Sequence, residues 1–237
     1  MLGESGERVE LLLPLPAPRS KVALEEAILL RRSIREWARS PLSLEDLSLI
    51  LWAAQGLAGY DGWPRRTAPS AGATYPLELY AVLGEEGVRV GGSFAEAGVY
   101  KYRWMRHSLA LVREGDVRRE LWAASLRQEW VLEAPVSIVI CAVHRRTTRR
   151  YGERGERYVY MEAGHAGQNI YLMAAALNLG TVAVGAFDDA AVARVIRAQA
   201  EERPLYIFPV GVPEKPSKGK FEELWKLLAE FRKRGKG

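Results

Sequence analysis

Cysteine, histidine and side-chain amides are scarce in this sequence of 237 residues. The single cysteine, Cys141, cannot form an intramolecular disulfide, and the three histidines are too far apart for metal-ligand spacing. Asn and Gln together number 6, against 26 Arg and 24 Glu. Few labile amides with many Arg and Glu are typical of thermophilic proteins. We therefore expect a cytoplasmic protein with a thermophile-like composition and no metal site.

The distribution of charged and apolar residues also predicts neither a signal peptide nor a membrane span. Glu4, Glu7 and Arg8 precede a very short apolar run, unlike a secretory signal. No formal charge occurs between Glu162 and Asp188, a stretch long enough to cross a bilayer. Glycine, histidine and amide side chains interrupt this stretch, so we interpret it as a buried helix followed by a buried strand, and we expect no membrane partner.

Several motifs of common enzyme classes are absent. The sequence has no G-x-x-x-x-G-K-[ST], no G-x-G-x-x-G and no G-x-S-x-G, which excludes a P-loop, a Rossmann fingerprint and a nucleophile elbow. Cys141 lies in an apolar β-branched run and is interpreted as a core thiol. Because the side chains offer no evident nucleophile, metal site or carboxylate pair, an enzymatic reaction would take its reactivity from a cofactor.

The composition indicates a globular protein with a mild basic excess. Hydrophobic residues make up 48% and charged residues 27%, with a net charge of +5, which excludes disorder and collagen. Six arginines between Arg145 and Arg157 form a basic segment, interpreted as a solvated loop. A nucleic-acid or anion-binding protein is an alternative interpretation of this segment. No recognised nucleic-acid module accompanies it, so we expect no such partner.

Apolar patterns predict helices and strands without strict alternation. After an extended lead-in over residues 1–21, we predict one domain over residues 22–237. Helices are expected at 22–38, 43–56, 116–130, 158–178, 188–199 and 221–232, and strands at 77–83, 88–104, 108–113, 136–143, 181–184 and 205–210. A long loop at 57–76 is typical of a functional segment. This mixture predicts an α+β fold rather than a doubly wound sheet.

Capping residues mark two of these helix ends. Ser43, followed three residues later by Asp46, resembles a capping box. Asn178-Leu179-Gly180 is typical of a C-terminal cap. The sequence therefore predicts one helix beginning at residue 43 and another ending near residue 178.

Three segments carry residues suited to a flat, phosphate-bearing ligand. Arg31-Arg32-Ser33-Ile34-Arg35 combines guanidinium and hydroxyl groups, and on a helix Arg31 and Arg35 would share a face. The small residues of Pro69-Ser70-Ala71-Gly72-Ala73-Thr74-Tyr75-Pro76 permit close backbone approach. Gly185-Ala186, within Leu179–Phe187, can offer a backbone N–H. Taken alone, each segment is explained equally well or better as a solvated face, a loop or core.

In this order and spacing, together with Pro209-Val-Gly-Val-Pro213, the segments resemble the nitroreductase family of flavin enzymes over residues 22–220. Pro69–Tyr80 and Gly98-Val-Tyr100-Lys-Tyr102, followed by His107-Ser-Leu109, are most similar to its azoline oxidases, the SagB-type dehydrogenases. The resemblance implies a mainly antiparallel sheet flanked by helices. It also implies an obligate homodimer with FMN at each of two interface sites.

The resemblance further implies roles for individual residues. Arg31 would contact the FMN phosphate, Arg32 and Ser33 would hold phosphate or ribityl oxygens, and Arg35 would lie at the N1 and O2 edge. A cation there stabilises the anionic reduced flavin. The other cofactor-binding candidates are Pro69, Ser70 and Ala71 from the second subunit, the Gln128 amide, the backbone of Gly185 and Ala186, and Lys218 and Lys220 at the phosphate.

Proton delivery has no assigned residue. Some nitroreductases carry a glutamate at the position of Gly185, and this sequence does not. Lys101 and Tyr102 are candidates, although an ordinary strand position explains both. The family's SagB-type branch often has an acidic residue and a proline after its tyrosine, where this chain has Arg103-Trp104.

The resemblance predicts ping-pong hydride transfer through flavin N5, with NAD(P)H as donor and a small planar molecule as acceptor. One alternative is an azoline dehydrogenase, in which FMN removes hydride from a heterocycle and oxygen reoxidises the flavin. Another is a flavin-storage protein without turnover. The loops 57–68 and 100–107, with Tyr60, Trp63, Trp104 and Met105, are expected to set the substrate.

Overall fold

The computed structural model describes residues 10–234, and the first nine residues of the predicted lead-in lie outside this range. Its elements are β1 Glu10–Leu12, α1 Leu24–Leu30, β2 Leu42–Ser43, α2 Leu44–Gln55, β3 Leu57–Tyr60, β4 Pro64–Arg66, η1 Ala71–Ala73 (a 3-10 turn), β5 Leu77–Leu83, β6 Val88–Val90, β7 Ser93–Phe94, β8 Gly98–Arg103, β9 Ser108–Glu114, α3 Arg118–Ala124, α4 Glu129–Glu133, β10 Val136–Ala142, α5 Arg145–Tyr151, α6 Arg154–Ala176, β11 Gly180–Thr181, α7 Asp189–Val195, β12 Arg203–Gly211 and α8 Phe221–Arg234.

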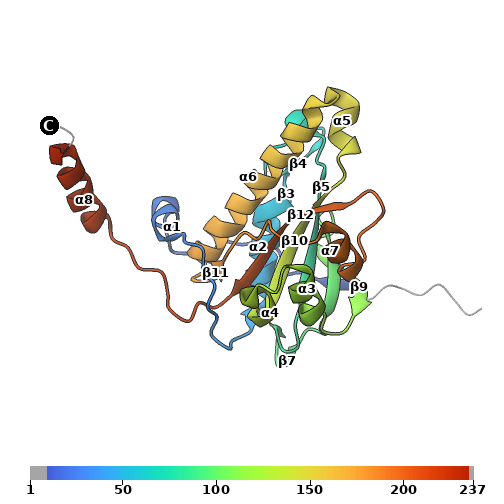
Figure 1. Cartoon of the computed structure of the whole chain (residues 1–237), viewed down its shortest axis with the longest axis horizontal. Coiled ribbons are helices and arrows are strands. Elements are labelled where there is room, and N and C mark those ends of the chain that lie inside the picture. The colour runs from blue at the N-terminus through green and yellow to red at the C-terminus, as the bar shows by residue number, and fades with distance from the viewer. Residues whose placement is uncertain (1–9, 235–237) are drawn as a thin grey trace, which may run out of the picture.

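A seven-stranded sheet lies at the centre of the molecule, in the order β1-β9-β8-β5-β10-β12-β11 (Figure 1). Each neighbouring pair is antiparallel. In β5, Leu77, Leu79, Ala81 and Leu83 face the core that includes α2 and α6, whereas Tyr80 and Val82 face the core that includes α3 and α7. Side chains of a strand alternate between its two faces, so both faces are covered. The predicted α+β fold with a mainly antiparallel sheet is confirmed.

The capping signals identify both helix ends. Ser43 Oγ accepts a hydrogen bond from the Asp46 N–H at 3.1 Å at the start of α2. At the end of α6, Asn178 has φ of +59°. The Leu179 N–H donates to the Ala174 carbonyl at 2.8 Å and the Asn178 N–H to Ala175 at 3.2 Å. This is the Schellman pairing of a helix C-terminus, with Asn in the left-handed position.

The first predicted helix is much shorter than expected. It spans Leu24–Leu30 rather than residues 22–38, and the chain turns extended at Arg31. Beyond it, Ser33 pairs with Thr181 and Trp37 with Pro213 as isolated bridges. Tertiary pairing overrides the helical pattern here, so the expectation that Arg31 and Arg35 share a helix face is wrong.

Other boundaries differ for local reasons. The predicted helix at 116–130 divides into α3 and α4, because Leu126 and Arg127 both have positive φ, at +55° and +56°. The basic segment 145–157, predicted as a loop, forms α5 and the first turn of α6. The predicted loop 57–76 contains the β3–β4 hairpin and η1.

Three predicted elements in the rest of the chain are also shorter or divided. The predicted strand 181–184 is reduced to the two residues of β11 and a bridge from Val184 to Ile207. Helix α7 is shorter than the predicted 188–199. The predicted strand 88–104 is three strands, with a turn at Gly91-Gly92 between β6 and β7.

The stretch without formal charge comprises the second half of α6, β11 and the loop after it. Its helix is amphipathic and lies against the sheet, as the buried residues Ala166, Ile170 and Ala174 show. Over residues 10–234, no helix combines the length and the apolar character needed to cross a bilayer.

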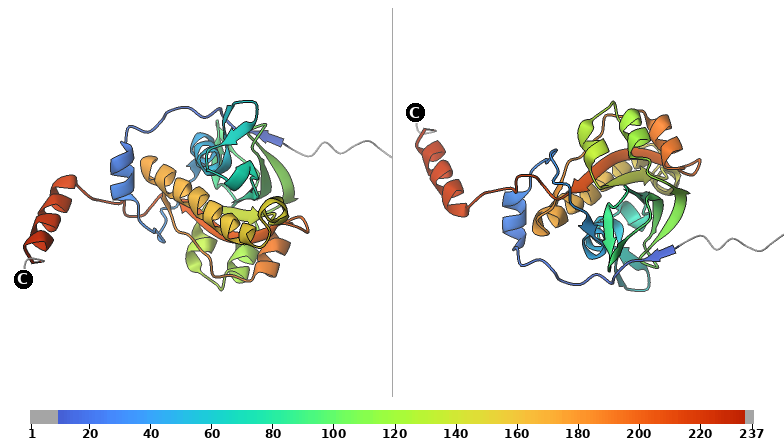
Figure 2. Two further views of the ribbon diagram at one scale, coloured as in Figure 1. Left: turned by 90° about the horizontal axis from the view of Figure 1, so that it is seen from above. Right: turned by 90° about the horizontal axis from the view of Figure 1, so that it is seen from below.

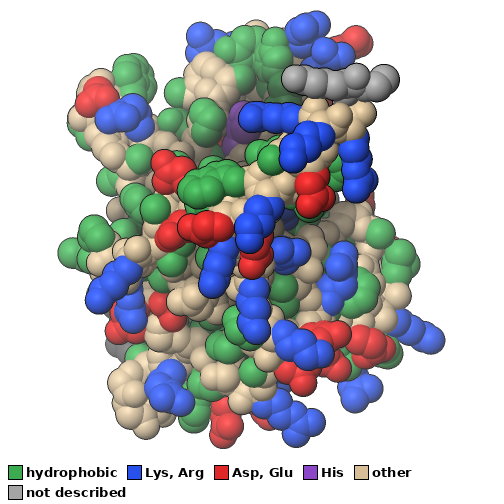
Figure 3. Space-filling view, turned by 90° about the vertical axis from the view of Figure 1, so that its left-hand side faces the viewer, with side chains coloured by type: hydrophobic (Ala, Val, Ile, Leu, Met, Phe, Trp, Pro, Cys, Tyr) green, Lys and Arg blue, Asp and Glu red, His purple; other side chains and the backbone are tan. Residues whose placement is uncertain are grey.

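Helix α8 stands apart from the rest of the molecule at the end of an extended segment, beyond α1 (Figures 1 and 2). None of its residues is buried. Trp225 is 59% exposed and Phe231 is 58% exposed, and Leu227 and Leu228 are exposed as well. Seen from this side, the molecule presents many Lys and Arg side chains interspersed with hydrophobic ones (Figure 3).

Candidate active site

Residues 31–37 lie beside β11, at the edge of the sheet. The Ile34 N–H donates to the Thr181 carbonyl at 2.9 Å. Glycine permits this approach, since a Cβ added to Gly180 would lie 2.7 Å from the Ile34 Cβ, and one added to Gly211 would lie 3.0 Å from the Trp37 ring. The structure therefore brings the arginine segment against the segment that leads to Gly185-Ala186.

Tyr171 of α6 connects these two segments. Its hydroxyl lies 3.0 Å from Ser33 Oγ and accepts the Ala183 N–H at 2.8 Å. The Arg31 guanidinium lies 5.3 Å from the centre of the Tyr171 ring, within cation–π range. One phenol thus orients a hydroxyl, a guanidinium and a backbone amide. The sequence analysis missed Tyr171, because one tyrosine in an amphipathic helix carries no chemical pattern.

Arg35, Gln128 and Ala186 are joined through the start of α4. The Arg35 guanidinium lies 5.2 Å from the centre of the Trp130 ring. The Gln128 amide nitrogen donates to the Ala186 carbonyl and the Ser125 carbonyl, both at 2.8 Å. Both amide protons are therefore used within the chain, and a ligand would meet the carbonyl oxygen of this side chain.

The segment after β12 adds basic side chains to the same region. Arg32 Nη2 donates to the Lys218 carbonyl at 3.1 Å, and the Glu214 N–H donates to the Glu36 carbonyl at 3.1 Å. Lys218 and Lys220 are exposed, and the Lys220 carbonyl accepts two N–H groups of the first turn of α8. Arg32 thus contacts the backbone of the segment that carries Lys218 and Lys220, and guanidinium and ammonium groups are suited to a phosphate.

Pro69, Ser70 and Ala71 lie elsewhere in the chain. The Ser70 hydroxyl accepts the Tyr75 N–H at 2.9 Å and lies close enough to Glu162 to lower the pKa of its carboxyl, whereas Ser33 Oγ lies 3.0 Å from the Tyr171 hydroxyl. Glu162 and Tyr171 both belong to α6, and nine residues of helix place them about 13 Å apart along the axis, on opposite sides. One chain therefore does not bring Pro69–Ala71 to the arginine segment.

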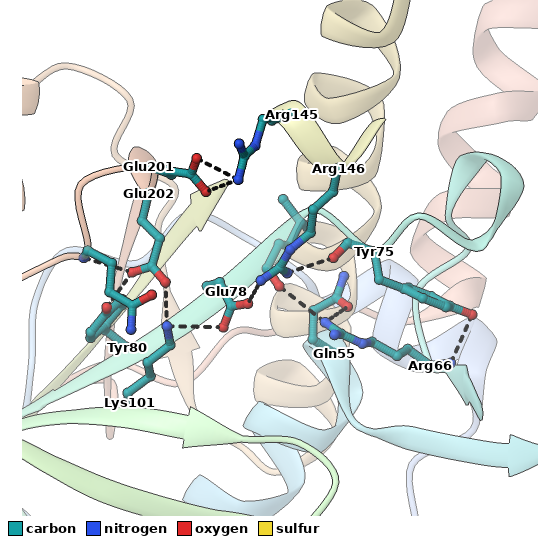
Figure 4. A network of polar contacts seen from close by, with 12 residues as sticks. Gln55, Arg66, Tyr75, Glu78, Tyr80, Lys101, Arg145, Arg146, Glu201 and Glu202 are labelled. Carbon is teal, nitrogen blue, oxygen red and sulfur yellow. Dashed lines mark hydrogen bonds and ion pairs between the residues drawn. The ribbon is translucent and has the colours of Figure 1, made fainter. Parts of the chain in front are cut away.

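A buried polar cluster anchors the Pro69–Pro76 segment. Glu162 is 2% exposed and lies 3.4 Å from Gln55 Nε2. Arg66 Nη1 donates to Gln55 Oε1 at 3.2 Å and to the Leu77 carbonyl at 3.1 Å (Figure 4). The Arg66 guanidinium lies 4.2 Å from the Trp104 ring centre and 5.0 Å from that of Tyr75. Burial raises the pKa of Glu162 to about 7 and lowers the pKa of Arg66 to about 10.

Lys101 lies in a second polar network. Its ammonium group pairs with Glu78 at 3.4 Å and with Glu202, which also accepts the Tyr80 hydroxyl (Figure 4). Arg146 of α5 pairs with Glu78 at 2.5 Å. Two cations thus meet two carboxylates, and Lys101 is held by both of them.

Tyr102 faces the other side of the sheet. Its hydroxyl lies 2.8 Å from His107 Nδ1, and His107 Nε2 lies 2.7 Å from Ser48 Oγ. Burial raises the pKa of the Tyr102 hydroxyl and lowers the pKa of His107. The hydroxyl is therefore occupied within the core, and a role for Tyr102 or Lys101 in proton transfer stays a prediction.

The model of the nitroreductase family matches residues 28–212, so the chain belongs to this family. It is 45% identical over 206 residues to MJ1384 of Methanocaldococcus jannaschii, whose name proposes a nitroreductase. The match covers 87% of this chain and 98% of MJ1384.

Solved structures share the fold. A proposed nitroreductase of Ralstonia eutropha JMP134 has a TM-score of 0.74 and 30% identity, covering 90% of this chain and 93% of its own. The E. coli microcin synthetase McbBCD complex has a TM-score of 0.64 and 21% identity, covering 87% and 78%. The NADPH:FMN oxidoreductase of Vibrio harveyi complexed with NAD+ has a TM-score of 0.57 and 20% identity, covering 83% and 72%.

Proposed function

We propose that this chain is an FMN-dependent oxidoreductase that takes hydride from NAD(P)H and passes electrons to a small planar acceptor by a ping-pong mechanism. The observation that carries the proposal is the gathering of Arg31, Ser33 and Arg35 with Gln128 and Ala186 beside β11. FMN supplies the redox chemistry when bound, because it accepts a hydride and releases electrons one or two at a time. Membership of the nitroreductase family supports this assignment.

In this proposal the residues of the chain bind FMN and orient it. Arg31, Arg32 and Lys218 hold the phosphate, and Ser33, oriented by Tyr171, offers its hydroxyl to the phosphate or ribityl oxygens. Arg35, placed over Trp130, provides a fixed positive charge. A fixed cation stabilises negative charge that develops during reduction, with no reorganisation cost at that moment.

We propose that two copies of the chain complete each site. Pro69, Ser70 and Ala71 lie too far from the arginine segment to serve the same site within one chain. The exposed apolar side chains of α8 supply surface for such an association. The second copy would therefore contribute Pro69–Ala71 to the cofactor.

A SagB-type azoline dehydrogenase is the second candidate. The form of Pro69–Tyr80 favours it, and the shared fold with the McbBCD complex is compatible with it. In this case the hydride comes from a heterocycle, and oxygen rather than a second organic substrate takes the electrons. The two candidates differ in whether NADPH reduces the bound flavin.

Anaerobic titration of the purified chain with FMN, followed by NADPH, tests the proposal. We expect a flavin absorption band that NADPH bleaches. We expect Arg31→Gln to weaken FMN binding about 10-fold to 100-fold, since charge-assisted hydrogen bonds contribute about 1.5–3 kcal/mol. Arg119→Gln, at an exposed position of α3, is the matched control. A band that NADPH leaves unchanged favours the azoline dehydrogenase, and absence of flavin binding overturns both candidates.

A further inference from the structure

A cleft of about 570 Å³ opens beside β5, β8 and β9, away from the arginine segment. Tyr80 and Lys101 line it on the sheet, the turn Arg103–Arg106 lines one side, and Arg197 and Gln199, which follow α7, line another. In the sheet order, β8 lies four strands from β11, a separation of about 19 Å. The volume suits a small organic molecule.

The carboxylates beside this cleft are already paired with cations. Glu78 is matched by Lys101 at 3.4 Å and Arg146 at 2.5 Å, and Lys101 also pairs with the buried Glu202 (Figure 4). This network is neutral by itself, with two cations and two carboxylates. The carboxylates are therefore already satisfied and offer no site for a cation.

The remaining charges on the lining are arginines. Arg106 pairs with Glu10 at 3.0 Å. Within residues 10–234, no carboxylate lies within ion-pair distance of Arg103 or Arg197, and Arg103 acts on Glu10, the partner of Arg106, only at longer range. Arg197 Nη1 donates only to the Val112 carbonyl, at 3.3 Å. Two guanidinium groups therefore line the same cleft with N–H donors that no carboxylate accepts within the described residues. This arrangement favours the binding of an anion.

Apolar side chains complete the lining. Trp104, Met105, Leu111 and Val112 border the same cleft, and Met105 is 72% exposed. An exposed methionine beside an indole can adapt to a flat apolar molecule. The cleft thus combines apolar walls with two guanidinium groups that have no ion-pair partner in the described part of the chain.

We propose that this cleft is a second binding site, which takes an organic anion with a planar apolar body and a carboxylate. Arg103 and Arg197 hold the carboxylate, and Trp104 and Met105 contact the body. The cleft shares no residue with the arginine segment or with Pro69–Ala71, so its ligand would make none of the contacts proposed for FMN.

Isothermal titration calorimetry with 2-naphthoate tests the site, with uncharged 2-naphthalenemethanol as the matched probe. The full-length chain is titrated with and without saturating FMN, so that binding at a flavin site is separated from binding at the cleft. We expect naphthoate to bind about 10-fold more tightly than the alcohol, and its affinity to fall with added salt. We expect saturating FMN to leave this binding unchanged.

Arg103→Gln and Arg197→Gln should each weaken naphthoate binding about fivefold or more, while Arg119→Gln leaves it unchanged. Circular dichroism checks that the variants fold, and the salt dependence of the unaltered chain is an independent readout. The proposal is overturned if naphthoate fails to bind at millimolar concentration, if the alcohol binds equally well, if FMN displaces naphthoate, or if both arginine variants bind as the unaltered chain does.

Discussion

Glu162 is a carboxyl group in an almost fully enclosed position. Burial raises the pKa of this carboxyl. Ser70, Gln55 and the nearby cation Arg66 lower the pKa, but together they lower it by less than burial raises it. The folded pKa is about 7, against 4.5 as the ordinary value. Between these two pH values the folded chain keeps a proton that the unfolded chain has lost. The free energy of unfolding therefore falls as pH rises through this window, by about 3 kcal/mol in total.

Glu162→Gln should remove this pH dependence. The amide has nearly the same shape and cannot ionise, so the variant should gain stability relative to the unaltered chain as pH rises from 5 to 8. Urea denaturation at both pH values measures the difference. Glu230→Gln, on exposed α8, should follow the unaltered chain. A Glu162→Gln variant that also follows it would show that Glu162 ionises normally in the folded protein.

At the residue scale, site residues could be predicted from the sequence only where they stand next to one another in the chain. The segments Arg31–Arg35 and Gly185-Ala186 were selected by their order, and the structure pairs the first with Thr181, in the segment that leads to the second. Tyr171 and Glu162 were missed because their partners are remote. Ser33 and Tyr171 are 138 positions apart, and Gln55 and Glu162 are 107 apart. Such pairs follow from tertiary packing and leave no local pattern.

At the scale of elements, long buried strands and capped helices were predictable, and short edge elements were not. β5 and β10 have strong apolar patterns. The start of α2 is marked by the capping residue Ser43, and the end of α6 is marked by Asn178 in the left-handed conformation. α1 has 7 residues, and so short a helix gains little from its own hydrogen bonds. The chain after it pairs with β11 instead, which gives the arginine segment its extended form.

Gly180→Ala should disturb this pairing. The added Cβ would lie 2.7 Å from the Ile34 Cβ, so the arginine segment must shift, at a cost of about 1–3 kcal/mol. We expect lower thermal stability and weaker FMN binding. Gly164→Ala is the matched control, because a Cβ there meets nothing within 4 Å in the middle of α6. That variant should be more stable, by up to about 1 kcal/mol. Equal stability of the two variants would contradict the steric argument.

At the scale of the whole molecule, α8 is the element with the least support from its own chain. Phe221, Trp225 and Leu228 follow helical spacing, and the rings of Phe221 and Trp225 lie 6.3 Å apart. This amphipathic pattern was predictable from the sequence, but its position away from the body was not. The position depends on the extended segment 212–220, which has no periodic pattern.

We expect α8 to contribute to a homodimer. The double substitution Trp225→Glu with Phe231→Glu should raise the dimer dissociation constant at least 10-fold, because two large apolar side chains would lose their partners. Sedimentation equilibrium measures the change. Lys226→Gln, on the same exposed helix, should leave the dissociation constant unchanged. A double variant that associates as the unaltered chain does would place the interface elsewhere.

The placement of Ser33 and Ser70 on opposite sides of α6 has a consequence for how the cofactor is retained. If each site draws on two chains, occupancy obeys mass action in the protein as well as in the flavin. Dilution then releases the cofactor even when its own concentration is held constant, and added flavin drives the chains to associate. The absorbance of bound flavin and the average molecular mass of the protein would rise and fall together along one dilution series.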